Sequence, residues 1–292
     1  MSGRRCFACA PLLVLTGCAA FNHGVLNAAG SVAHEQREYL VIIVLVMLLV
    51  IGPVLLLTPL VAWHYRIGNK KHAYRPNWGF SWTLEGLIWI PPSLIVIGLA
   101  ILLWDRTDQL DPYRPLPSAQ APLEVQAVAL DWKWLFLYPE EGVATVNELA
   151  VPTDRPVHIS LTSGTVMQSI LIPRLAGQIY AMPGMTTQLN LNATTPGTYL
   201  GENTQFNGKG FPQDKFSVLA LPPAAYEAWL MRVRRTGPPL DAATVERLFK
   251  PSTVAKPLLF SSAPPDIFER VLARFNTGSP MQPPSAIAGA TP

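Results

Sequence analysis

The fold of the chain is decided by the stretch Leu130-Asp131-Trp132-Lys133-Trp134-Leu135-Phe136-Leu137-Tyr138-Pro139. Its aromatic residues recur at every second position, and a period of two is typical of a β-strand with one buried face. Similar alternation lies on both sides of it, and Pro and Gly separate the runs, at residues 123–130, 157–162, 189–192 and 216–218. Several short strands at this spacing predict an all-β sandwich or barrel of about a hundred residues.

Helical patterns follow the β-region. They cover residues 222–235, 240–249 and 265–275, and in the first of them Tyr226 and Trp229 share one face. The last residues, 280–292, are rich in Pro and are predicted to be disordered.

Two long apolar runs precede the β-region. Charged residues make up 14% of the 292 residues and hydrophobic residues 49%, which indicates a membrane protein whose apolar residues cluster in blocks. Residues 39–65 and 86–104 contain no Asp, Glu, Lys or Arg, and about 20 such residues cross the hydrocarbon core of a bilayer. The sequence therefore predicts two transmembrane helices. The net charge of +3 is too small and too scattered to indicate a nucleic-acid partner.

The charges beside the spans indicate their orientation. The loop between them carries four basic residues and no acidic residue before Glu85, namely Arg66, Lys70, Lys71 and Arg75. Because Lys and Arg accumulate in cytoplasmic loops, we expect the loop inside the cell and both termini outside.

The N-terminus has the layout of a secretory signal. Arg4 and Arg5 precede a short apolar run at 7–15, and the run ends in Leu15-Thr16-Gly17-Cys18, which resembles a bacterial lipobox. This resemblance implies cleavage before Cys18 and a diacylglycerol on its thiol. The alternative is an uncleaved anchor in which Cys18 is incidental.

The external region has few residues that could hold a redox metal. All cysteines lie within the first eighteen residues, and the β-region contains a single histidine, His158. A blue copper site needs a thiolate and two imidazoles, and a dinuclear copper centre needs two of each. The same count disfavours a nucleophilic triad, because only His158 could act as its base. The sequence therefore predicts a binding and structural module.

The whole pattern resembles subunit II of haem-copper oxidases, and within that family the bacterial ubiquinol oxidases of the cytochrome bo type. The residues that carry the resemblance are 130–139, 142–148, 169–185, 196–199, 249, 251–252 and 260–261. The resemblance implies a two-helix transmembrane hairpin, an all-β cupredoxin-like sandwich and C-terminal helices.

The resemblance also implies a division of the chain. We expect a signal peptide at 1–17, an external segment at 18–38, transmembrane helices at 39–63 and 85–104, a cytoplasmic loop at 64–84, a linker at 105–122, a cupredoxin-like domain without copper at 123–221, a helical arm at 222–279 and a disordered tail at 280–292.

The copper ligands of the cytochrome c oxidases in this family fall on other residue types here. Laid on the family pattern, the ligand positions are Gln168, Asn203, Gln205, Asn207, Phe211 and Asp214. This substitution pattern resembles the quinol oxidases, and it disfavours a cytochrome c oxidase subunit II. A free-standing lipoprotein with a degenerate cupredoxin domain, acting in oxidase assembly or binding, is the remaining alternative.

The resemblance also implies the function, location, cofactors and partners of the chain. It implies a non-catalytic subunit of a proton-translocating quinol:oxygen oxidoreductase in the bacterial inner membrane, with its large domain in the periplasm. No cofactor other than the Cys18 lipid is expected in this chain, while haems and copper are expected in subunit I. Further small membrane subunits, lipid and quinol complete the expected partners.

Glu85 is the remaining candidate. It opens the second span at the cytoplasmic edge. A carboxylate here is either a helix N-terminal residue favoured by the macrodipole or a functional group at the membrane interface. The family resemblance favours the second interpretation, because it implies a Glu at the mouth of a proton pathway into subunit I.

Overall fold

A computed structural model describes residues 24–66, 69 and 77–276 of the chain. Cys18 and the tail at 280–292 lie outside the described residues. The chain divides into two compact units: Glu35–Asp111 form one, and the residues before and after them form the other. The second unit, called the β-domain below, therefore includes described residues from both sides of the apolar hairpin.

The smaller unit consists mainly of two long apolar helices, α2 (Ser31–His64) and α3 (Trp82–Gln109). Both are long and apolar enough to cross a membrane, by length and composition. Ser81 begins α3 as its N-cap, with its side chain accepting from the Leu84 amide. The helices extend past the predicted spans, since polar turns continue them: at the end of α3 the Gln109 amide donates to the Asp105 carboxylate (2.9 Å).

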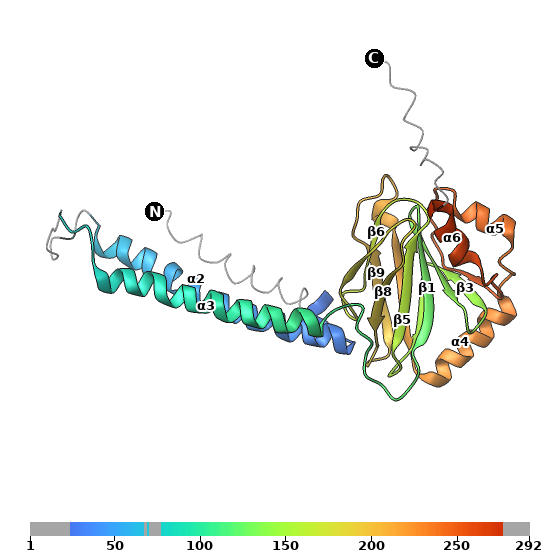
Figure 1. Ribbon diagram of the computed structural model, residues 1–292, viewed down its shortest axis with the longest axis horizontal. Helices are drawn as coiled ribbons and strands as arrows, with labels where there is room; N and C mark the ends of the chain where they lie inside the picture. The colour runs from blue at the N-terminus through green and yellow to red at the C-terminus, as the bar shows by residue number, and fades with distance from the viewer. Residues whose placement is uncertain (1–23, 67–68, 70–76, 277–292) are drawn as a thin grey trace, which may run out of the picture. The chain divides into compact units, whose positions relative to one another are not determined.

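The β-domain is a sandwich of two sheets (Figure 1), which confirms the predicted fold class. Six strands form the first sheet in the order β11-β3-β2-β1-β5-β8, and five form the second in the order β4-β10-β9-β6-β7. The first sheet contains β1 (Leu123–Leu130), β2 (Lys133–Tyr138), β3 (Val143–Val146), β5 (Val157–Ser163), β8 (Thr187–Leu191) and β11 (Leu258–Phe260). The second contains β4 (Glu148–Pro152), β6 (Gln168–Leu171), β7 (Gln178–Ala181), β9 (Gly197–Asn203) and β10 (Lys215–Leu221).

Strand β2 is the stretch that decided the fold, and its aromatic face fills the core. Trp134 and Phe136 pack against Phe216 of the opposite sheet, with ring centroids 5.9 and 5.1 Å away. The Phe216 ring lies across its neighbouring strand β9, and it requires a glycine at position 201, because a Cβ there would lie 2.1 Å from the ring. Core burial on this face supplies much of the free energy of folding.

The other face of β2 is also buried, which alternation alone did not predict. Leu135 and Leu137 join a second hydrophobic cluster with residues of the C-terminal arm, namely Leu240, Val245, Leu248, Phe260, Ile267, Phe268 and Val271. The arm contains helices α4 (Pro223–Thr236), α5 (Ala242–Leu248) and α6 (Ile267–Asn276), which Figure 1 shows on the β3 side of the sandwich. Three residues that the sequence did not indicate as a strand form β11, which pairs antiparallel with β3. The arm is therefore part of the domain's core.

Candidate functional site

The connection from β9 to β10 brings four of the six ligand-pattern residues together at one end of the sandwich. Asn203 ends β9, Asp214 directly precedes β10 and Asn207 lies between them. Gln168 opens β6, the neighbour of β9. The Asn203 and Asn207 amides each donate to Asp214 Oδ2 at 2.9 Å, and Asn207 also donates to Gln168 Oε1 at 3.1 Å. We call these four residues the amide cluster.

Three residues of the amide cluster are buried, and the fourth, Asn207, is partly buried. Gln168 and Asp214 are fully buried and Asn203 is 4% exposed. Burial raises the pKa of the Asp214 carboxyl to about 6, although the hydrogen bonds from Asn203 and Asn207 and the Lys133 ammonium oppose this shift. The carboxyl therefore titrates well above the ordinary range of an Asp.

Two of the six positions do not join the amide cluster through their side chains. Gln205 contributes its backbone amide, which donates to Asn203 Oδ1 (2.9 Å). Phe211 turns to Phe206, with ring centroids 5.6 Å apart, and Phe206 is 72% exposed. Position 211 thus carries an aromatic ring, and the Gln205 side chain lies outside the network.

Trp132 holds the loop over the amide cluster. Its backbone is left-handed, with φ 64°, and its indole nitrogen donates to the Asn207 carbonyl at 3.1 Å. A Cβ at Gly210 would lie 2.2 Å from the indole ring, so the loop can approach this closely only with glycine there. Trp132 therefore packs under the loop, consistent with a structural role.

Lys133 is a buried residue of this region that the sequence reasoning missed. Its ammonium donates to the carbonyls of Asp131 (3.1 Å), Lys250 (3.0 Å) and Ser252 (3.0 Å) and to the Ser252 hydroxyl (3.0 Å). Desolvation lowers the pKa of Lys133, while Asp131 and Asp214 act in the opposite direction. A lysine at the start of an otherwise apolar strand was the available signal, and its burial depends on the arm that covers it.

The donor set of the amide cluster does not fit a redox copper ion. Copper centres of electron transfer use thiolate and imidazole ligands, whereas the groups gathered here are three amides and one carboxyl. The amide N–H groups of Asn203 and Asn207 are directed at the carboxylate oxygen, so they act as hydrogen-bond donors and have no lone pair to offer a metal. Hydrogen bonds join the cluster through Asp214 Oδ2 and Gln168 Oε1, whereas Asp214 Oδ1 and Asn207 Oδ1 are buried without a hydrogen-bond partner.

Glu85 lies in the first turn of α3, within the smaller unit, whereas the amide cluster belongs to the β-domain. The Trp89 indole nitrogen, one turn later, donates to Glu85 Oε2 at 3.0 Å. This hydrogen bond holds the carboxyl along the helix surface.

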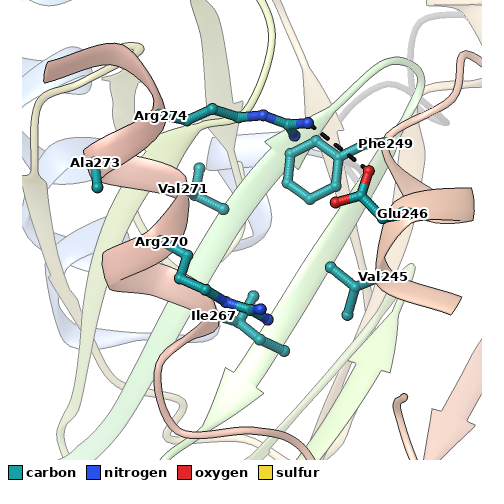
Figure 2. Close-up of a pocket in the computed structure, with 8 residues that line it drawn as sticks. All are labelled: Val245, Glu246, Phe249, Ile267, Arg270, Val271, Ala273 and Arg274. Atoms are coloured by element: carbon teal, nitrogen blue, oxygen red, sulfur yellow. Dashed lines mark ion pairs between the residues drawn. The ribbon is translucent and has the colours of Figure 1, made fainter. Parts of the chain in front are cut away.

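A pocket of about 330 Å³ lies between α5 and α6 (Figure 2). Val245, Ile267 and Val271 contribute apolar surface to it. Arg274 lies over the Phe249 ring, 4.6 Å from its centroid, and pairs with Glu246 at 3.8 Å. Arg270 pairs with Asp266 at 3.3 Å. Both arginines that line the pocket thus have acidic partners, and the pocket presents little net charge.

Comparison with known proteins places this fold and site in a class. Residues 139–213 match the family described as cytochrome c oxidase subunit II, periplasmic domain. The class of protein is therefore an oxidase subunit II with a cupredoxin-like domain.

Three curated relatives narrow the class. The cytochrome bo(3) ubiquinol oxidase subunit 2 of Pseudomonas aeruginosa is 40% identical over 91% of this chain and 80% of its own length. Its counterpart in Pseudomonas putida is 42% identical over 92% and 86%, and the ubiquinol oxidase subunit 2 of Acetobacter aceti is 42% identical over 92% and 87%. The chain belongs to the ubiquinol oxidase subunit 2 family.

Proposed function

We propose that the chain is the non-catalytic subunit II of a proton-translocating quinol:oxygen oxidoreductase of the aerobic respiratory chain. The observation that carries the proposal is the amide cluster: four of the six positions that bind copper in the family pattern meet in space, yet they carry hydrogen-bonding amides and a carboxyl. A domain of this kind has no relay for electrons from a soluble cytochrome. The relatives named ubiquinol oxidase subunit 2 support a lipid-soluble donor instead.

In this proposal the chain binds no redox cofactor, and haems and copper belong to subunit I. The hairpin of α2 and α3 braces subunit I within the inner membrane, with further small membrane subunits beside it, and the β-domain caps the periplasmic side. Apolar helices of this length support the membrane assignment.

The test is purification of the tagged chain from native membranes. We expect haem to co-purify, quinol-dependent oxygen consumption to accompany it, and the isolated chain to contain no stoichiometric copper. A particle without haem would refute the oxidase assignment. Copper bound to the β-domain would instead favour a cytochrome c oxidase subunit.

Glu85 is proposed to lie at the mouth of a proton pathway into subunit I. Its place in the first turn of α3 and its hydrogen bond from Trp89 leave one carboxylate oxygen for a proton donor. We expect Glu85→Gln to slow turnover of the assembled oxidase by about tenfold, which corresponds to about 1.4 kcal/mol of added barrier. Oxygen consumption and proton uptake are the measurements.

The matched control is Glu38→Gln, a carboxylate near the start of α2, which should leave turnover unchanged. Equal turnover in the wild type and the Glu85 variant would remove Glu85 from the pathway, while the haem content would still report on assembly.

The Cys18 thiol is proposed to carry a diacylglycerol after signal cleavage, which together with two helices gives a stable anchor. We expect the mature N-terminal peptide to begin at Cys18 and to carry the mass of the lipid in mass spectrometry. Cys18→Ser should retain residues 1–17. An unmodified Cys18 in the intact wild-type chain would contradict the assignment.

A further inference from the structure

The segment before α2 lies against the β-domain, a contact that the sequence did not indicate. It begins with a 3-10 turn, η2 (Gly24–Asn27). The Ala29 amide donates to the Arg174 carbonyl (2.7 Å) and the Thr194 amide donates to the Ala29 carbonyl (2.8 Å). Arg174 Nε donates to the Asn27 carbonyl (2.6 Å). The segment is thus held by its backbone between two loops of the sandwich.

Asn192 closes the contact at the first residue of α2. Its side-chain oxygen accepts from the Ser31 amide (2.9 Å) and from the Ser31 hydroxyl (2.8 Å). The first amides of a helix have no partner within it. Asn192, which directly follows β8, therefore satisfies one of these amides from a distant part of the chain.

Only small residues fit at the points where the N-terminal segment contacts the β-domain. Ala29 is 3% exposed and Ala33 is fully buried. A Cβ on Gly30 would lie 2.2 Å from the Asn192 carbonyl oxygen and 3.0 Å from that of Leu175. Because both obstacles are backbone atoms, a larger residue could enter only by displacing the segment.

Strand β8 holds the chain that leaves the hairpin, through Asn190. The Asn190 amide and its side-chain amide both donate to the Pro112 carbonyl at 3.0 Å. The Asn190 side-chain oxygen is 2.9 Å from His158 Nδ1, so the imidazole orients the amide group toward Pro112. His158, the one histidine of the β-region, thus positions the Asn190 side chain.

We infer that Asn190 and Asn192 form a latch that binds the exported N-terminal segment and the first residue after the hairpin. The surface around Arg174, Leu175 and Asn192 is in this view a docking site for a peptide of the chain's own sequence Asn27-Ala28-Ala29-Gly30-Ser31. Its chemistry fits a short backbone segment with small side chains that leads into a helix. The latch fixes residues from both sides of α2 and α3 on one domain.

Hydrogen exchange in the full-length chain purified from membranes tests the latch. In Asn192→Ala we expect exchange at the amides of Ala29, Ser31 and Thr194 to rise about tenfold, the size expected when one or two net hydrogen bonds are lost. The matched control is Gln188→Ala, which removes an amide side chain from β8, the strand that directly precedes Asn192, and should leave these rates unchanged. Exchange equal to wild type in the Asn192 variant would overturn the inference.

A cysteine pair gives a second measurement that does not depend on the stability of the Asn192 variant. The Ser31 and Asn192 side-chain oxygens are 2.8 Å apart, so S31C/N192C should form a disulfide on mild oxidation. S31C/Q188C should not, because position 188 lies four residues before position 192, about 13 Å away along an extended chain. Peptide mass spectrometry distinguishes these bonds from any that involve the native cysteines. Absence of the first cross-link, with both thiols reactive, would equally overturn the latch.

Discussion

Lys133→Met should destabilise the β-domain by about 3 kcal/mol, since it removes a buried charged donor from several partly buried acceptors at once. The variant leaves the carbonyls of Asp131, Lys250 and Ser252 without the ammonium that joins them. Two of these belong to the arm, so we expect the arm to loosen from β2 first. Urea unfolding of the detergent-solubilised chain, followed by tryptophan fluorescence, measures the change because Trp132 and Trp134 flank the site.

Lys215→Met is the matched control. Lys215 lies at the start of β10 with a 51% exposed side chain, 3.8 Å from the Glu202 carboxylate, and an exposed substitution of this kind changes stability by about 0.5 kcal/mol or less. If the two variants unfold at the same urea concentration, the Lys133 ammonium does not hold the arm.

Asp214 should make the β-domain less stable as the pH rises from about 4 to about 6. Burial raises the pKa of this carboxyl to about 6, so the folded protein keeps the proton to a higher pH than the unfolded chain, in which the pKa is about 4. Stability is therefore highest below the unfolded pKa, falls as the pH passes through this window and levels off above the folded pKa. A difference of about two pKa units corresponds to about 3 kcal/mol.

Asp214→Asn should abolish that part of the pH dependence, because an amide does not titrate in this range. The free energy of unfolding, measured at several pH values between 4 and 7, gives the comparison. Asp241→Asn is the control: Asp241 caps α5 by accepting from the Thr244 amide, and this bond lowers its pKa. A wild-type curve that is superimposable on the Asp214→Asn curve would show that the carboxyl is not responsible.

The fold could be predicted from the sequence largely because the aromatic residues of β2 recur at every second position. The alternation of Trp134, Phe136 and Tyr138 records the face that packs on the opposite sheet. A period of two does not predict the second buried face, where Leu135 and Leu137 contact the arm. That contact joins residues more than a hundred positions apart, and local periodicity carries no information about it. Strand β11 was missed for the same reason, since three residues are too few to show a period.

The candidate site was predictable in part. The family pattern pointed to the amide cluster, and Gln168, Asn203, Asn207 and Asp214 do meet. Which atoms meet was not predictable, because the Asn207 side chain depends on how the loop folds over Trp132. The burial of Lys133 was hidden for a similar reason: one of its four oxygen partners comes from the turn between β1 and β2, and three come from the arm.

The latch at Asn190 and Asn192 limits how far the docking surface can lie from a lipid anchor on Cys18. Only residues 19–26 separate Cys18 from Asn27, and a stretch this short spans at most about 30 Å when fully extended. An acyl anchor on Cys18 would therefore keep the docking surface near Arg174 within that distance of the lipid headgroups. Lengthening this stretch with Gly and Ser would increase that maximum distance without altering any contact in the fold.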